Sequence, residues 1–257
     1  MKICRYRLPA DETPRWGRVE DGVVLPWQPE GGLPGGEALP LEAVTLLAPL
    51  AGSRVFGIGR NYAEHIAELN PGWSQRAPLV FMKPDSALIG PGEPIRLPEG
   101  IGRVDYEGEL ALVIGRGGRH IPEARALEHL LGLCCANDLS ARELQESDGQ
   151  WIRAKGHDGF CPLGPWIVTG LDPADLAIRT WLNGGLVQDS RSSLMLRPPA
   201  ALISFLSSFC TLRPGDLILS GTPAGVGPLA PGDRVRVEIE GVGALENPVL
   251  AEDIHAL

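Results

Sequence analysis

Three carboxylates occur at alternate positions in the segment RVDYEGELALVIGR, residues 103–116, whose second half is apolar. Because alternate residues of a β-strand point to the same face, Asp105, Glu107 and Glu109 would lie close together. Carboxylates held so close repel one another and raise each other's pKa values. A hard divalent cation such as Mg²⁺ or Mn²⁺ removes that repulsion, because such cations prefer oxygen ligands. The pattern is compatible with a metal site and also with a solvated strand face of unpaired acids.

Asp138 is the best candidate for a third metal ligand. It follows LGLCCAN, residues 131–137, an apolar segment that predicts a buried strand. The strand would fix the backbone of Asp138 while its side chain lies at the strand end. The expected metal ligands are therefore Glu107, Glu109 and Asp138.

The segment NYAEHIAEL, residues 61–69, predicts a helix that carries a histidine and a glutamate three residues apart. Residues at this spacing are neighbours on a helix surface. Glu68 could accept a proton from one ring nitrogen of His65 and so orient the other nitrogen as a base. The alternative is an exposed helix on which the pair is incidental.

Two further segments could bind an anionic substrate. Lys155, in WIRAKGHDGF, is one of three lysines among 23 basic residues, and its compact ammonium group could neutralise a carboxylate or an enolate oxygen. The segment LSGTPAGVG, residues 219–227, predicts a strand that leads into a glycine-rich loop. Backbone N–H groups in such a loop can approach an anion closely. The alternatives are a surface lysine and an ordinary turn.

The elements that position these residues are mostly strands, and most strands are joined as hairpins. This pattern predicts an α+β fold with a large, mainly β core. Residues 1–50 are predicted to form a small N-terminal domain rich in β-structure, and residues 51–257 the catalytic domain. We expect a continuous strand over 104–115, helices over 121–132 and 199–209, and hairpins over 178–190 and 234–250, the first turning at Asn183–Gly184.

The composition argues against several classes of function. The chain of 257 residues has a net charge of −9 and no basic run, which argues against nucleic-acid binding. No segment approaches the ~18 consecutive apolar residues that a membrane-spanning helix needs. The five cysteines form no CxxC pair and the first residues do not resemble a signal peptide. We therefore expect reduced thiols and a cytoplasmic location.

In their order and in their residues, several segments resemble the fumarylacetoacetate hydrolase superfamily. The resemblance covers about residues 55–245 and implies a mixed β-sandwich roll that assembles as a homodimer. The matching segments are GRNYAEHIAEL, LVFMKPDSALIGPGEPI, VDYEGELALVIGR, ANDLSARELQ, WIRAKGHDGFCPLGPWIV, LNGGLVQ and LILSGTPAGVGPLAPGDRVRVEIEGVG.

The resemblance also implies roles for individual residues. It implies one Mg²⁺ or Mn²⁺ ion bound by the three carboxylates, with Asp105 left at the rim of the site. It implies that His65 and Glu68 form a catalytic dyad on a mobile segment. The implied substrate contacts are the catalytic Lys155, together with Gln145, Thr222 in the GTP loop and Lys83 in FMKP.

The implied reaction is chemistry at a metal-bound enolate of a small 2-oxo or 2-hydroxy-dienoic acid. The chain looks most similar to the 2-hydroxyhepta-2,4-diene-1,7-dioate isomerase and 5-carboxymethyl-2-hydroxymuconate isomerase–decarboxylase members, which belong to aromatic-acid catabolism. The first alternative is hydrolysis of a C–C bond in acylpyruvates or fumarylpyruvate, or decarboxylation of oxaloacetate, at the same site. A protein that binds metal and ligand without catalysis is the second alternative.

Overall fold

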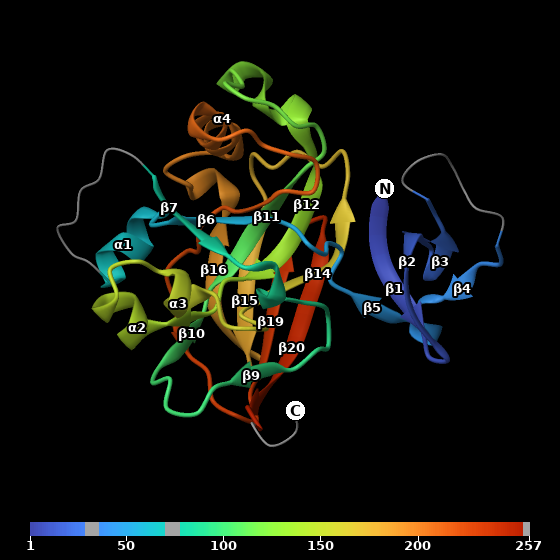
Figure 1. The fold of residues 1–257 in the computed structure, drawn as a ribbon, viewed down its shortest axis with the longest axis horizontal. Coiled ribbons are helices and arrows are strands. Elements are labelled where there is room, and N and C mark those ends of the chain that lie inside the picture. Colours follow the sequence, from blue (N-terminus) through green and yellow to red (C-terminus); the bar gives the residue numbers. More distant parts are fainter. Residues whose placement is uncertain (29–35, 70–77, 254–257) are drawn as a thin grey trace.

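The computed structural model describes residues 1–28, 36–69 and 78–253, and β-strands dominate it (Figure 1). The largest sheet has the strand order β4-β3-β2-β1-β14-β12-β11-β17-β6-β7, with β5 paired to β1 and β8 paired to β14. Its strands are β1 (Lys2–Leu8), β2 (Asp11–Glu20), β3 (Val23–Pro26), β4 (Leu39–Pro40), β5 (Thr45–Leu47), β6 (Val55–Gly59), β7 (Leu79–Lys83), β8 (Leu88–Ile89), β11 (Gly108–Ile114), β12 (Leu130–Asn137), β14 (Cys161–Val168) and β17 (Leu217–Leu219).

Two smaller sheets and a few short helices complete the described fold. One sheet has the order β16-β15-β19-β20-β9 and the other has the order β13-β10-β18. Their strands are β9 (Ile95–Leu97), β10 (Val104–Tyr106), β13 (Ser140–Ala141), β15 (Ala177–Leu182), β16 (Gly185–Arg191), β18 (Gly227–Pro228), β19 (Arg234–Ile239) and β20 (Gly243–Ala251). The α-helices are α1 (Ala63–Leu69), α2 (Arg142–Ser147), α3 (Ile152–Lys155) and α4 (Pro199–Phe209), and the 3₁₀ helices are η1 (Leu41–Ala43), η2 (Asp85–Ala87), η3 (Glu123–His129) and η4 (Ser192–Leu194).

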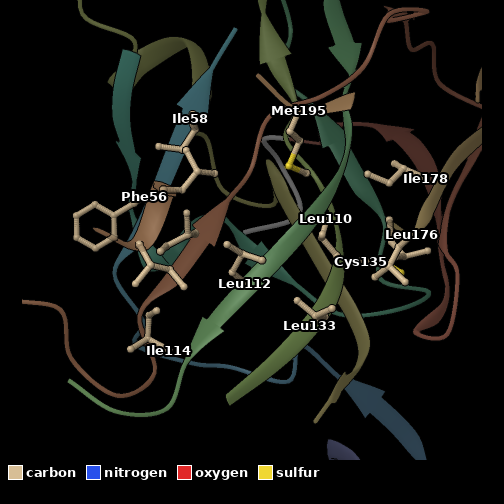
Figure 2. Packing of buried hydrophobic residues seen from close by; sticks show 14 of the residues in the cluster. Phe56, Ile58, Leu110, Leu112, Ile114, Leu133, Cys135, Leu176, Ile178 and Met195 are labelled. Atoms are coloured by element: carbon tan, nitrogen blue, oxygen red, sulfur yellow. The ribbon is translucent and has the colours of Figure 1, made fainter. Parts of the chain in front are cut away.

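The main core lies between the largest sheet and the five-stranded sheet, and α4 covers one end of it. Alternation along β11 explains this arrangement, because successive residues of a strand face opposite sides. Leu110, Leu112 and Ile114 pack into the core that contains Ile178 of β15, as Figure 2 shows. The residues between them pack into a second core on the other face of the sheet. Both faces of β11 are therefore buried.

The N-terminal strands continue the largest sheet instead of standing apart from it. Strand β1 pairs antiparallel with β14, with Ile3 opposite Ile167. These strands also have a small core of their own, which contains Tyr6 and Val24. The division at residue 50 remains a prediction, since the sheet is continuous across the two parts.

The predicted fold class is confirmed, and so are the two predicted hairpins. Strands β15 and β16 turn at Asn183–Gly184, where both residues have positive φ, as a two-residue hairpin turn requires. Strands β19 and β20 form the second hairpin. The helix predicted over 199–209 is α4, which begins with Pro199 in its first turn. Among the described residues, no helix has the length and apolar character needed to cross a membrane.

The prediction of one continuous strand over residues 104–115 was wrong. The chain forms β10 and β11, which lie in different sheets, and Glu107 lies between them. Strand β11 starts at Gly108, where a Cβ atom would lie 2.1 Å from Oγ1 of Thr180. The close packing of the two sheets at this point therefore demands glycine. Periodicity alone could not reveal the break, since every residue of both strands is buried.

The prediction of a helix over residues 121–132 was right only for Glu123–His129, and this helix is of the 3₁₀ type. The chain forms the 3₁₀ helix η3 and then enters β12 at Leu130. Two of the last three predicted helical residues instead pair with β11, with Gly132 opposite Val113 and Leu130 opposite Ile114. A Cβ atom on Gly132 would lie 2.4 Å from the carbonyl oxygen of Val168. Tertiary pairing therefore overrides the helical pattern of this segment.

Candidate active site and metal centre

Three carboxylates meet at neighbouring ends of β11 and β12. The antiparallel register places Glu109 opposite Ala136, so Asp138 is its diagonal neighbour across the pair. Glu107 immediately precedes β11, and its carbonyl oxygen accepts the N–H of Asp138 at 2.8 Å. One oxygen from each carboxylate lies within 4.8 Å of the others, and each residue is 4% exposed or less. The structure thus brings together the three residues predicted as metal ligands.

The charges around these carboxylates fit a bound cation. Burial, together with the charges of Asp138 and Glu107, raises the pKa of Glu109 well above its ordinary value. In the described part of the chain Glu109 forms no salt bridge, and its carboxylate accepts the N–H of Gly221 at 2.7 Å. No positively charged side chain among the described residues therefore forms an ion pair with Glu109. A buried group of three carboxylates is a hard oxygen donor set suited to Mg²⁺ or Mn²⁺, so the residues present fit such an ion.

Two buried lysines lie against the same carboxylates. Nζ of Lys155 donates to Glu107 at 2.8 Å and to Asp138 at 2.5 Å. Burial acts to lower the pKa of Lys155, but the charges of Asp138 and Glu107 outweigh it and raise the pKa. Nζ of Lys83 donates to the other oxygen of Asp138. Lys83 does not line the cavity described below, so its predicted substrate contact stays a prediction.

Asp105, expected at the rim of the site, is fully buried and is among the residues that line the cavity described below. Its carboxylate accepts hydrogen bonds from Arg103 and, at 2.7 Å, from Nε of Arg142. Arg142 also forms an ion pair with Glu107, in which its Nη2 lies 2.7 Å from Oε1. Burial acts to raise the pKa of Glu107, but Lys155 and Arg142 lower it below the ordinary range. Arg142 therefore connects Asp105 to a metal-ligand candidate.

His65 and Glu68 lie on α1, and His65 lines the cavity described below. Nδ1 of His65 lies 3.4 Å from Oε2 of Glu68, and His65 is 6% exposed. Burial lowers the pKa of His65, although the nearby charges of Glu107 and Glu68 partly oppose this effect. The N–H of Gly225 donates to both oxygens of Glu68 at 3.3 Å, which ties α1 to the glycine-rich loop. The predicted dyad is therefore present as a geometric pair.

Thr222, in the glycine-rich loop, lies at the cavity wall with its hydroxyl already engaged. The hydroxyl donates to the carbonyl of Gly108 at 3.0 Å and accepts from Nε2 of Gln188 at 2.8 Å. Gln188 also accepts the N–H of Gly108 at 3.0 Å. Thr222 thus links the loop to the start of β11, and its predicted contact with a substrate carboxylate stays a prediction.

A cavity of about 530 Å³ opens over the carboxylates. Helices α1, α2 and α3 lie together at this end of the molecule, away from the N-terminal strands (Figure 1). Gln145 of α2 lines the cavity and accepts a hydrogen bond from Nη1 of Arg142 at 2.9 Å. The predicted site residues that line the cavity are His65, Glu107, Glu109, Asp138, Gln145, Lys155 and Thr222.

Sequence reasoning did not assign four residues that shape this site. Arg142 follows Asp138 by four positions, and an arginine so close to a predicted acid cluster was a usable signal. Gln188 occurs in the predicted hairpin segment LNGGLVQ, but its burial was not predictable. The other two line the cavity, where the guanidinium of Arg60 lies 6.0 Å from the centre of the Trp151 ring.

A family model described as the C-terminal domain of fumarylacetoacetate (FAA) hydrolase matches residues 54–250. The chain belongs to the fumarylacetoacetate hydrolase family. A second model, described as Rv2993c-like, N-terminal, matches residues 1–49. The match of the first model includes the three carboxylates, the dyad and the glycine-rich loop.

Known proteins of the fumarylacetoacetate hydrolase family that resemble this chain are enzymes of several kinds. The solved 5-carboxymethyl-2-hydroxymuconate delta-isomerase of Mycobacterium smegmatis is 47% identical with a TM-score of 0.90, and the match covers 98% of this chain and 100% of that one. The mitochondrial oxaloacetate tautomerase fahd2 of Xenopus laevis is 44% identical over 220 residues, which are 80% of this chain and 69% of the relative.

A more distant structure of the same fold contains a metal. The maleylpyruvate hydrolase of Sphingobium sp. SYK-6 was solved with manganese(II) and pyruvate. It is 29% identical with a TM-score of 0.83, and the match covers 98% of this chain and 100% of that one. These relatives therefore include an isomerase, a tautomerase and a hydrolase.

Proposed function

We propose that this protein is an isomerase or decarboxylase of small 2-oxo or 2-hydroxy-dienoic acids, of the kind formed when aromatic acids are broken down. The observation that carries the proposal is that His65, Lys155 and three buried carboxylates line one cavity. Removal of a proton beside a 2-oxo group needs a base and a stabilised negative charge at the same place. The cavity supplies both.

Glu107, Glu109 and Asp138 would hold one divalent cation, Mg²⁺ or Mn²⁺. When bound, the cation supplies Lewis-acid charge that stabilises negative charge on a substrate oxygen. Glu109 would depend on it, because burial and the neighbouring carboxylates raise its pKa and it forms no ion pair among the described residues. The manganese in the Sphingobium structure supports the assignment.

His65 would remove the proton and return it. Burial lowers its pKa, so the imidazole is neutral near pH 7 and able to accept a proton. Glu68 holds Nδ1, and with Nδ1 as the donor, Nε2 is the nitrogen that accepts. Glu68 therefore orients the base and does not itself take the proton. General acid–base catalysis of this kind contributes about 10²–10⁴-fold to the rate.

Lys155 would stabilise the enolate that proton removal leaves behind. The ammonium group is buried and held by two carboxylates, so it needs little reorganisation during the reaction. Return of the proton to a different carbon completes an isomerisation, and loss of CO₂ from a 2-oxo diacid produces an enolate of the same kind. Gln145 would contact the substrate through its amide N–H groups, since its oxygen already accepts from Arg142.

The similarity to the Mycobacterium smegmatis isomerase and to the Xenopus laevis tautomerase supports proton transfer as the reaction. Both names describe the movement of a proton and a double bond without cleavage of the carbon chain. We also propose that the chain assembles as a homodimer, an expectation that comes from the family resemblance.

Hydrolysis of a C–C bond is the second candidate function, and the pyruvate in the Sphingobium hydrolase structure favours it. The same site would serve, with His65 removing a proton from a water molecule. The resulting hydroxide would add to a carbonyl carbon, and the bond to the neighbouring carbon would break to release an enolate. Acylpyruvates and fumarylpyruvate are suitable substrates, and oxaloacetate decarboxylation is compatible with the same geometry.

A substrate panel tests the proposal. Dienoates of the homoprotocatechuate type, acylpyruvates and oxaloacetate would be incubated with Mg²⁺ or Mn²⁺, and the products identified by NMR. A shifted double bond or released CO₂ supports the leading function, whereas two carbon fragments support the hydrolase. Full activity in a strong chelator would contradict the metal-dependent scheme.

A further inference from the structure

Asp105 is a buried carboxylate outside the group of three candidate metal ligands. It lies on β10, in the three-stranded sheet that also holds β13, just after Asp138, and β18, just after the glycine-rich loop. It is fully buried, and a buried charge must be paired. Nε and Nη2 of Arg103 donate to it at 2.6 and 3.1 Å, and Nε of Arg142 donates at 2.7 Å. Both carboxylate oxygens are therefore occupied by arginines.

Among the described residues, Arg142 alone contacts both Asp105 and Glu107. Its three guanidinium nitrogens have three different partners: Nε contacts Asp105, Nη1 contacts Gln145 and Nη2 contacts Glu107. A planar guanidinium holds its donors in a fixed fork, so fixing Nε orients the other two nitrogens. The ammonium of a lysine has no such fork and could not keep the same three partners.

We propose that Asp105 is a positioning residue that sets the cation affinity of the site through Arg142. With Asp105 present, the charge of Arg142 is shared between two carboxylates. Without Asp105, Glu107 would be the only carboxylate paired with the positive charge of Arg142. Glu107 would then bind the guanidinium more tightly and offer less negative charge to a metal ion. The inference rests on the proposed metal site, and it assigns no metal contact to Asp105, whose oxygens lie outside the group of three candidate ligands.

The test measures Mn²⁺ binding by isothermal titration calorimetry in four proteins: the wild type, Asp105→Asn, Arg142→Gln and the double variant. Partners that orient metal ligands typically contribute 10–100-fold to affinity, so Asp105→Asn should weaken Mn²⁺ binding by about 10-fold. In the Arg142→Gln background the same change should alter affinity by less than about twofold, because coupled residues are not additive. A merely structural role would give equal losses in both backgrounds.

Arg103→Gln is the matched control. Arg103 also binds Asp105, but its side chain is half exposed, and among the described residues it forms no ion pair with Glu107. It should therefore change the Mn²⁺ affinity by less than about twofold. A loss as large as that of Asp105→Asn would contradict the route through Arg142.

Arg142→Lys keeps the test decisive if Asp105→Asn does not fold. It retains the positive charge but loses the fork, so Mn²⁺ binding should again weaken by about 10-fold. Melting of each metal-free protein shows which variants fold. Wild-type affinity in Asp105→Asn or Arg142→Lys, or equal losses in both backgrounds, would overturn this inference alone. A wild type that binds no Mn²⁺ would overturn both this inference and the metal site.

Discussion

Glu109→Gln should make the metal-free protein more stable relative to the wild type as pH rises. In the folded protein, burial and the charges of Asp138 and Glu107 raise the pKa of Glu109 well above its ordinary value. Between the unfolded value of about 4.3 and the raised folded value, folding takes up a proton. The wild type therefore loses stability with rising pH in this window, whereas glutamine has no proton to lose.

The size of the effect follows from proton linkage. One proton taken up on folding changes the free energy of unfolding by about 1.4 kcal/mol per pH unit. The free energy of unfolding of Glu109→Gln, minus that of the wild type, should therefore increase by about 1.4 kcal/mol between about pH 5 and 6. Contributions from other titrating groups, such as His65, are common to both proteins and cancel in the difference.

Urea unfolding in EDTA at several pH values measures this difference. Adding Mn²⁺ should make the wild type the more stable of the two proteins. A ligand at about 100 times its Kd stabilises the wild type by about 2.7 kcal/mol, whereas the variant should gain almost nothing. Glu42→Gln, an exposed change in the N-terminal part, is the control and should alter stability by less than about 0.5 kcal/mol. A difference between Glu109→Gln and wild type that stays constant with pH would refute the argument that the three carboxylates repel one another.

Three further predictions concern catalysis. Lys155→Met should lower kcat by about 10²-fold or more in steady-state assays, because it removes the charge proposed to stabilise the enolate; an unchanged kcat would contradict that role. His65→Ala should lower kcat by about 10²–10⁴-fold while Mn²⁺ affinity, measured by calorimetry, changes by less than about twofold; loss of Mn²⁺ binding would argue against a purely catalytic role. Burial lowers the pKa of His65, so the acidic limb of the kcat/KM profile should lie below about pH 6.5. Glu68 partly raises that pKa, so Glu68→Gln should move the limb to still lower pH, and an upward shift would contradict the dyad.

The candidate site was predictable where its chemistry depends on local spacing. Glu107 and Glu109 are two residues apart, and their expected repulsion made a cation site one of the two interpretations of the pattern. His65 and Glu68 are three residues apart on a helix, which brings their side chains together without help from the rest of the fold. Asp138 could be proposed because it directly follows a predicted buried strand. The strand fixes its backbone and places its side chain at the strand end.

Other parts of the site could not be predicted, because they depend on contacts between distant segments. Arg142 contacts Asp105 across 37 residues, and Gln188 contacts Thr222 across 34 residues. Such contacts depend on which strands become neighbours. The burial of Asp105 also depends on which strands become neighbours. It was not predicted, because the alternation rule treated residues 104–115 as one strand with all three acids on one face.

The sequence by itself determined the local turns, the alternation of buried side chains and the residues able to carry out metal and acid–base chemistry. These properties depend on a few neighbouring residues, as the Asn183–Gly184 hairpin illustrates. Tertiary structure decided where the long acidic segment breaks, at Glu107, and turned the end of a helical pattern into β12 by pairing it with β11. It also decided the charge balance of the site, because burial removes the water that would otherwise screen each carboxylate and makes its protein partners the main influence on its charge.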